Sequence, residues 1–339
     1  MTANQSILNW GILGAARVTE KLIPAILAAK NARLLAVASR RSGAAADVLK
    51  KYAPTEHTVL ALDDPEALLT HPDIDVIHLP MANEEHAMWA LKAIANGKHV
   101  LVEKPLALRV EDIDAITQAA KEKGVQVMEG FMYRFHPQHE AVQKIIASGA
   151  IGDVRTVSTR FAFPMKPARL YRVNRSIEHG GGAMWDIGPY AVHTARLWFE
   201  DEPETVTALA KLNEHGADLS LAGTFGYSGG RFAQFEMSFE HARRSVYEII
   251  GTKGGITCHT VWQPADEVAT ISWWTESGQQ ETIEIAAADQ FILEIEHFSD
   301  CVLNNREPLL SLQDARANCQ AIVAALQSVK TGKTVTIAA

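Results

Sequence analysis

The chain has 339 residues and a formal net charge of −8, from 32 basic and 40 acidic residues. This length favours two domains, and the acidic balance argues against a nucleic-acid-binding surface. No apolar run approaches the roughly 18 residues that a membrane span needs, and residues 1–6 lack the pattern of a secretory signal. The three cysteines have neither metal-binding nor redox spacing. We therefore expect a cytoplasmic protein with free thiols and no bound metal.

The first half of the chain alternates short apolar runs with helical patterns. The alternation predicts a parallel, doubly wound sheet of six strands in a first domain of residues 1–130. The run at residues 125–128 is the sixth of these strands. The apolar runs that we assign to strands are residues 7–13, 34–38, 76–79, 100–102 and 125–128. Helical patterns lie around residues 18–27, 65–69, 84–95 and 113–123.

The first predicted strand leads into a turn that contains Gly14. Strand, tight turn and helix in this order are typical of the start of a dinucleotide-binding unit. Gly14 can form the turn, whereas Ala16 and Thr19 stand where the fingerprint has its second and third glycines. The motif alone also fits an ordinary strand–helix turn. Pro24 should kink the following helix or mark a late first turn.

The second predicted strand ends at Ser39-Arg40-Arg41. In dinucleotide-binding folds the group that reads the ribose follows this strand, and it is acidic for NAD and basic for NADP. A hydroxyl and two guanidinium groups can bind a 2′-phosphate through charge-assisted hydrogen bonds. We therefore predict NADP as the cofactor, with NAD possible. The alternative is a solvated basic turn.

The apolar run at residues 100–102 ends abruptly in Glu103-Lys104-Pro105. Ligands bind beyond the carboxyl ends of the strands in an open parallel sheet, so Glu103 and Lys104 should project toward the ligand. The pKa of a lysine shifts readily on burial, which makes Lys104 a candidate general acid or base. The alternative is a solvated Glu–Lys pair at a strand end.

From residue 154 the apolar pattern changes to a period of two, which is typical of half-buried strands. We predict a large open, mostly antiparallel sheet with one polar face, which makes the whole chain an α/β protein. This second domain, residues 131–339, should bind the substrate, and its last elements are helices at residues 291–303 and 312–329. The alternating runs lie around residues 157–163, 206–212, 219–225, 233–239, 246–250, 271–274 and 283–285.

Three glycines at residues 180–182 precede a segment with Asp186 and Tyr190. The glycines suit a close approach to a ligand or a strand. On a helix, Asp186 and Tyr190 would share one face, with Pro189 tolerated in a first turn and His193 within reach of the same face. A carboxylate beside a phenol and a lysine can move one proton. The alternative is an Asp that caps a helix and a Tyr in the core.

These motifs resemble the glucose-fructose oxidoreductase / inositol dehydrogenase / MocA family. Glu103-Lys104-Pro105 carries the likeness to the whole family, and residues 128–138, 180–190 and 294–300 resemble its branch of dimeric dihydrodiol dehydrogenases and NADP-dependent D-xylose dehydrogenases. The resemblance covers nearly the whole chain. It implies a Rossmann domain, a C-terminal α/β domain with an open sheet, and a dehydrogenase or reductase. Such an enzyme transfers a hydride between NADP and a sugar or cyclic diol, an aldose- or dihydrodiol-type substrate.

Carried over position by position, the resemblance implies two groups of site residues. The catalytic group would be Lys104, Tyr190 and Asp186. The cofactor would contact Gly14, Ala16, Arg17, Val18, Ser39, Arg40, Arg41, Leu79, Pro80, Asn83, His86, Glu103 and Lys104. Separately, from their position in loops, we expect the substrate to meet Arg134, Tyr171, Arg172 or Asn174, and His193, three residues beyond Tyr190, is a further candidate.

The resemblance also implies a cis peptide bond at Lys104-Pro105 and a homodimer or homotetramer formed through the C-terminal sheet. Two departures from the family pattern concern the cofactor: the missing glycines of the first turn, and Ala82 in place of a proline before Asn83. Two other functions remain open. A cofactor-binding sensor or scaffold would not need the Lys104, Asp186 and Tyr190 set. A glycoside-cleaving enzyme with tightly held NAD would favour an acidic residue after the second strand.

Overall fold

The computed structural model describes residues 7–262, 264 and 267–337. The chain divides into two compact units. The first unit runs to Phe135 and also contains Asp289–Arg316, and the second contains His136–Ala288 and the segment from Ala317 onward. The predicted division into residues 1–130 and 131–339 differs mainly in that returning segment. Its helix packs with the first unit because its apolar face, which includes the fully buried Phe298, is covered there.

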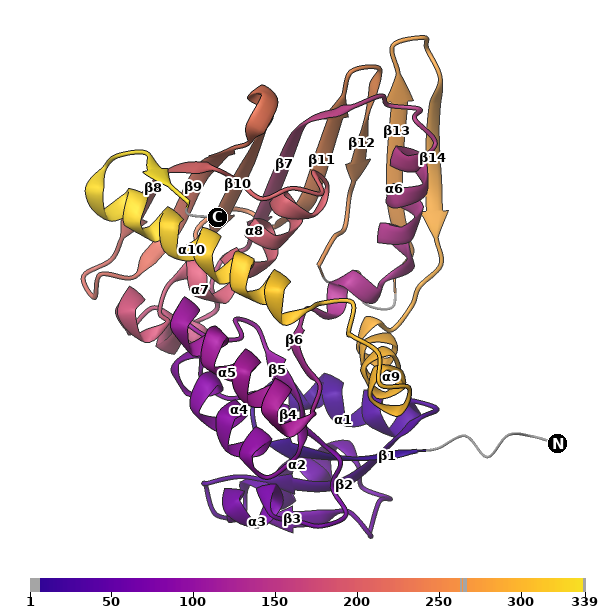
Figure 1. Ribbon diagram of the computed structural model, residues 1–339, viewed down its shortest axis with the longest axis vertical. Coiled ribbons are helices and arrows are strands. Elements are labelled where there is room, and N and C mark those ends of the chain that lie inside the picture. Colours follow the sequence, from indigo (N-terminus) through magenta and orange to yellow (C-terminus); the bar gives the residue numbers. More distant parts are fainter. Residues whose placement is uncertain (1–6, 263, 265–266, 338–339) are drawn as a thin grey trace, which may run out of the picture. The chain divides into compact units, whose positions relative to one another are not determined.

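In the described part of the first unit, six parallel strands form one sheet in the order β3-β2-β1-β4-β5-β6 (Figure 1). The reversal of strand order between β1 and β4 is the point at which doubly wound sheets bind ligands. β3 gave no sequence signal because it is short and its side chains are exposed or half-buried. The strands are β1 (Leu8–Leu13), β2 (Ala32–Ala38), β3 (Leu60–Leu62), β4 (Val76–Leu79), β5 (His99–Glu103) and β6 (Val127–Gly130).

Helices cover the faces of this sheet (Figure 1). α1 packs against α2 and α9, while α4 packs against α5, β4 and β5. Pro24 lies inside α1, so the helix neither begins late nor ends at the proline. Gly124 caps the end of α5 with a φ of 68°, as the sequence predicts. The helices are α1 (Thr19–Ala28), α2 (Ala44–Tyr52), α3 (Pro65–Leu69), α4 (His86–Ala95), α5 (Val110–Lys123) and α9 (Gln290–Leu303).

The second unit is built on a nine-stranded sheet, counted over the described residues, in the order β14-β13-β12-β11-β7-β10-β9-β8-β15. β7 and β10 are parallel, and the other neighbouring strands are antiparallel. The predicted open, mostly antiparallel sheet is therefore confirmed. The strands are β7 (Val154–Ala162), β8 (Thr205–Leu212), β9 (Asp218–Gly226), β10 (Phe232–Ser238), β11 (Arg244–Gly251), β12 (Gly254–Cys258), β13 (Ala269–Thr275), β14 (Gln280–Ile285) and β15 (Val335–Thr336).

Helices lie on one face of this second sheet. α8 packs on β7 and β10, α7 on β9 and β10, and α6 on β13. Ser328 of α10 also binds the sheet, because its Oγ accepts the Ala208 N–H at 2.9 Å. The strand positions that alternate with the buried ones carry mainly polar side chains, and exposed apolar ones among them include Leu209 (76% exposed) and Phe232 (41%). The helices are α6 (Pro137–Ala147), α7 (Ala183–Asp186), α8 (Gly188–Leu197) and α10 (Leu312–Thr331).

Two further findings concern the described residues as a whole. None of their helices combines the length and the hydropathy required to cross a bilayer, and no group of three or more of their His, Cys, Asp and Glu side chains could hold a metal ion. Cys258, Cys301 and Cys319 are buried and form no disulfide bond.

Candidate active site

The turn after β1 packs against the ends of two neighbouring strands. Gly14 has a φ of +133°, and a Cβ at this position would lie 3.0 Å from Met81 Sδ. The Gly14 N–H donates to Ala38 O at 2.8 Å, which ties the turn to the end of β2. Thr19, in place of the third glycine, is buried and donates through Oγ1 to Ala16 O at 2.6 Å. These hydrogen bonds therefore hold the turn in place although the second and third glycines of the fingerprint are absent.

The basic residues that follow β2 lie beside this turn. The Arg41 guanidinium donates to Ala15 O at 3.0 Å, and the Arg41 N–H donates to Ser39 Oγ at 3.1 Å. Arg40 pairs with Glu85, with 2.6 Å between Nη1 and Oε1. Positive charge therefore stands next to the glycine turn, although a carboxylate already binds one of the two guanidinium groups.

Lys104 follows β5, and the backbone after it is held by the neighbouring strand. The Lys104-Pro105 peptide bond is cis, as the resemblance implies. Glu129, buried in β6, accepts the Leu106 N–H through Oε1 at 2.9 Å. The position of Lys104 is thus determined by two adjacent parallel strands, β5 and β6.

His86 links the Lys104-Pro105 segment to the end of β4. Its Nδ1 lies 2.7 Å from Pro105 O, and its Nε2 lies 3.1 Å from Met81 O. Burial lowers the pKa of His86, the two carbonyl oxygens raise it, and the nearby positive charge of Lys104 lowers it further, with a lowered pKa as the net result. His86, predicted to contact the cofactor, is therefore a buried ring that fixes the backbone on either side of the candidate site.

In the second unit, the glycine segment makes room for a buried carboxylate. Gly182 has a φ of +101°, and a Cβ there would collide with Asp218 Oδ1. Asp218 Oδ2 accepts the Met184 N–H at 2.7 Å at the start of α7. Burial raises the pKa of Asp218 to about 6, and backbone N–H groups, among them that of Met184, act in the opposite direction. The predicted close approach is thus an approach of Gly182 to β9.

Asp186 and Tyr190 lie on two successive helices. α7 ends at Asp186, and α8 begins at Gly188 with Pro189 in its first turn, as predicted. Tyr190 is 6% exposed, and its ring meets Phe161 of β7 edge-on, with 5.8 Å between the centroids. The phenol is therefore positioned by the face of the sheet that the helices cover.

Arg172 joins Asp186 and Tyr190 in one cluster. Its Nη1 donates to Asp186 Oδ1 in an ion pair. Burial lowers the pKa of Arg172, but the charges of Asp186, Tyr171 and Tyr190 together raise it above its ordinary value. The spacing of the sequence gave no signal for this pair, because Arg172 ends a 3-10 helix, Pro167–Arg172, that the sequence pattern did not predict.

Comparison with known proteins decides the family. The model described as "Oxidoreductase family, NAD-binding Rossmann fold" matches residues 8–131, and the GFO/IDH/MocA C-terminal domain matches residues 139–257. The chain belongs to the GFO/IDH/MocA oxidoreductase family. The predicted family, fold class and NAD(P)-linked dehydrogenase or reductase are therefore confirmed.

Relatives of known activity match this family member over nearly its whole length. D-xylose 1-dehydrogenase (NADP(+)) 2 of Haloferax volcanii is 30% identical over 97% of this chain and 99% of its own. Trans-1,2-dihydrobenzene-1,2-diol dehydrogenase of Xenopus laevis is 32% identical over 91% of this chain and 93% of its own. The crystal structure of a 3-ketoreductase from Actinomadura kijaniata in complex with NADP and TDP-benzene superimposes with a TM-score of 0.87 at 27% identity, over 95% of this chain and 98% of that one.

The residues predicted to meet the substrate divide between the two units of this oxidoreductase. Arg134 belongs to the first unit, in the 3-10 turn Met132–Phe135. In the second unit, Tyr171 is 56% exposed, Asn174 is exposed, and His193 of α8 is buried. Arg172 already binds Asp186, so a role toward substrate would be additional to that pairing.

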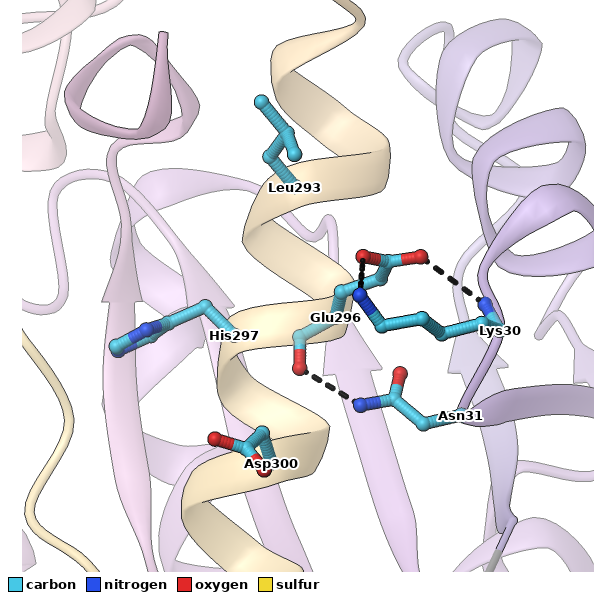
Figure 2. Close-up of a pocket in the computed structure, with 6 residues that line it drawn as sticks. All are labelled: Lys30, Asn31, Leu293, Glu296, His297 and Asp300. Carbon is cyan, nitrogen blue, oxygen red and sulfur yellow. Dashed lines mark hydrogen bonds and ion pairs between the residues drawn. The ribbon is translucent and has the colours of Figure 1, made fainter. Parts of the chain in front are cut away.

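A pocket of about 330 Å³ in the first unit lies elsewhere (Figure 2). Lys30 and Asn31 directly precede β2, so the pocket is at the amino end of that strand, opposite to the edge that carries Gly14 and Lys104. None of its lining residues belongs to the predicted site. The lining residues are Lys30, Asn31, Leu293, Glu296, His297 and Asp300.

Proposed function

We propose that this protein is an NADP-dependent oxidoreductase that transfers a hydride between nicotinamide and a carbon of a sugar or a cyclic diol. One observation carries the proposal: Lys104 follows β5 at the same sheet edge as the Gly14 turn and Ser39-Arg40-Arg41. That edge is where doubly wound sheets bind their nucleotides. The substrate class is carried over from the relatives, one of which is named for D-xylose and another for a dihydrobenzene diol.

The residues at this edge fit a phosphorylated dinucleotide. Gly14 carries no side chain in the turn before α1, where the backbone would lie close to the pyrophosphate. Arg41 and Arg40 would bind the 2′-phosphate of NADP, with Ser39 beside them. When bound, the nicotinamide supplies the hydride donor or acceptor. The other predicted contacts, including Leu79, Pro80 and Asn83, stand at the end of β4 or just after it.

The side chains would handle the proton of the substrate hydroxyl. In one scheme the Lys104 ammonium favours the ionised form of Tyr190, whose ordinary pKa is about 10. The phenolate then takes the proton of the substrate hydroxyl and becomes the neutral phenol. In the other scheme Lys104 transfers the proton itself. Arg172, held by Asp186, places a second positive charge near the phenol. Lys104 belongs to the first unit and Tyr190 to the second, and their meeting at one face of the nicotinamide ring is part of the proposal.

Assembly and location complete the proposal. We propose a homodimer or homotetramer formed through the C-terminal sheet, whose face opposite the helices exposes Leu209 and Phe232. We also place the protein in the cytoplasm. Sedimentation of the wild type beside a Leu209→Asp variant tests the assembly, because a charge on this face should shift an oligomer toward the monomer.

A substrate panel tests the function. Aldoses and cyclic trans-diols are offered with NADP and, separately, with NAD, and the absorbance of the reduced nicotinamide is followed. Turnover with free NADP is the expected result. Cofactor binding without turnover would identify a sensor or scaffold instead, and release of sugar without net reduction would identify a glycoside-cleaving enzyme. A clear preference for NAD would contradict the role given to Ser39-Arg40-Arg41.

A further inference from the structure

Two segments of the second unit carry basic side chains and no acidic ones. Neither residues 163–177 nor residues 241–246 contain an Asp or a Glu, although the chain as a whole has a net charge of −8. Both segments are therefore positively charged parts of an acidic protein. Their lysine and arginine residues are Lys166, Arg169, Arg172, Arg175, Arg243 and Arg244.

The fold places these two segments side by side at one end of β7. The first segment continues directly from β7, and its Phe163 N–H donates to Ser238 O, at the end of β10, at 3.0 Å. The second segment connects β10 to β11. Arg244, the first residue of β11, pairs in the sheet with Ala162, the last residue of β7. Positive charge from two parts of the sequence is thus gathered at one edge of the sheet.

Two arginines, one from each segment, contact the same aromatic ring. Cζ of Arg169 lies 5.6 Å from the centroid of the Phe163 ring, and Cζ of Arg243 lies 5.7 Å from it. Both distances are those of a cation–π contact, which holds each guanidinium group beside the ring. Two positive charges that share a ring repel each other, and an anion bound by both would remove this repulsion.

Two acidic side chains precede Arg243 in the chain, but other cations bind them. Glu236 pairs with Arg160 at 3.7 Å between nitrogen and oxygen, and Glu240 pairs with Lys211 at 2.6 Å. In the part of the chain that the structure describes, no ion pair includes Arg243, and this side chain is exposed. Its charge is therefore open to a ligand.

The arginine pair stands close to the phenol of the candidate active site. The Phe163 ring meets Phe161 edge-on at 5.6 Å between centroids, and Phe161 in turn meets Tyr190 edge-on at 5.8 Å. Two ring contacts thus separate the arginines from the phenol, and a ligand of the size of a phosphorylated sugar can span them. All of these residues belong to the second unit, so the arrangement does not depend on the first.

We propose, on the basis of the function above, that Arg169 and Arg243 bind a phosphoryl group of the substrate, so that this oxidoreductase prefers phosphorylated sugars to neutral ones. A phosphate monoester carries about −1.5 to −2 charge at pH 7 and several strong acceptor oxygens. It therefore matches two guanidinium groups, each of which offers several N–H donors. A uronic acid carries a single negative charge and a neutral sugar none, so both match the arginine pair less well.

The first test measures binding and needs no turnover. A hexose, its monophosphate and its uronic acid are titrated calorimetrically into the full chain, with and without NADP. The monophosphate should bind most tightly, and Arg169→Met and Arg243→Met should each weaken its binding by about tenfold, because each removes charge-assisted hydrogen bonds. Arg155→Met, which changes an exposed arginine at the other end of β7, is the matched control and should leave the dissociation constant unchanged.

The titration also decides against the proposal where it fails. A monophosphate that binds no more tightly than the hexose would overturn it, and so would equal dissociation constants in the wild type and both arginine variants. Tighter binding of the uronic acid would show that the arginines recognise a carboxylate instead. A nucleoside diphosphate hexose is titrated in parallel. Preference for either phosphorylated ligand supports the proposal, and the tighter of the two identifies the source of the phosphoryl group.

The second test is kinetic. The ratio of kcat/KM for the hexose monophosphate to that for the hexose should fall about tenfold in Arg243→Met, whereas Arg155→Met should keep the wild-type ratio. An unchanged ratio in Arg243→Met would contradict the phosphoryl contact. If neither phosphorylated nor neutral sugars are turned over, the proposed function fails, while the titration still decides whether the two arginines bind a phosphoryl group.

Discussion

The two units hold their functional groups in different ways. In the first unit, main-chain groups at the ends of adjacent strands do most of the positioning, as between Gly14 and Ala38. In the second unit, side-chain contacts do it, as in the Arg172–Asp186 pair and in the Asp218 carboxylate, which accepts the Met184 N–H at the start of α7. Strand topology thus positions the groups of the first unit, while a few charged side-chain contacts position those of the second.

The largest expected effect is on the reaction itself. Replacing Lys104 with alanine should lower kcat by roughly 10²–10⁴-fold, the usual contribution of a proton-transferring group, while NADPH still binds. Steady-state rates and the fluorescence of bound NADPH measure the two quantities. Lys92→Ala, which changes an exposed lysine that pairs with Glu66, is the matched control. Nearly wild-type turnover in Lys104→Ala with bound cofactor would discard both proton-transfer schemes.

A smaller effect should follow from filling the space at the glycine segment. Gly182→Ala combines a positive φ with a collision against Asp218, and it should cost about 2–4 kcal/mol of unfolding free energy. Gly216→Ala has a φ of +74° but open space around the new Cβ, and it should cost only about 1 kcal/mol. Urea unfolding compares the two variants. Equal losses would mean that backbone conformation alone requires the glycine, and not the approach to Asp218.

The smallest expected effect concerns the choice of cofactor. Arg41→Met should weaken NADPH binding by about tenfold while leaving NADH binding almost unchanged, because only NADPH carries the phosphate that the guanidinium would bind. Titration with each cofactor measures the ratio of the two dissociation constants. Arg33→Met, at an exposed arginine that binds Asn9, serves as the control. A similar loss for both cofactors would assign Arg41 to the glycine turn, through Ala15, instead of to the phosphate.

The difference between the units also sets what the sequence could predict. The apolar runs of β4 and β5 identify buried parallel strands, and the motif after β5 places Lys104 at the ligand-binding edge. Gly124 and Pro189 mark a helix end and a helix start through their own backbone preferences. Such signals depend only on residues that are adjacent in the chain, so they can be recognised in a single sequence.

The signals that failed were those without a local pattern. The strand Leu60–Leu62 is too short and too exposed to stand out. The Arg172–Asp186 pair and the contact of Gly182 with Asp218 join positions that only the folded chain brings together. The charge and size of each of these side chains follow from the sequence, but the residue that each one contacts does not.

The return of the chain to its first unit has a consequence for synthesis on the ribosome. Trp10 is fully buried, and its indole N–H donates to Ser299 Oγ at 3.1 Å, although the two residues are nearly 300 positions apart. A nascent chain that ends near Phe135 has all six parallel strands but not α9, and it exposes the surface on which that helix docks. This apolar surface stays exposed to solvent while the next 150 or so residues are translated, which takes about 10–30 s at typical elongation rates. During that time it is prone to aggregation.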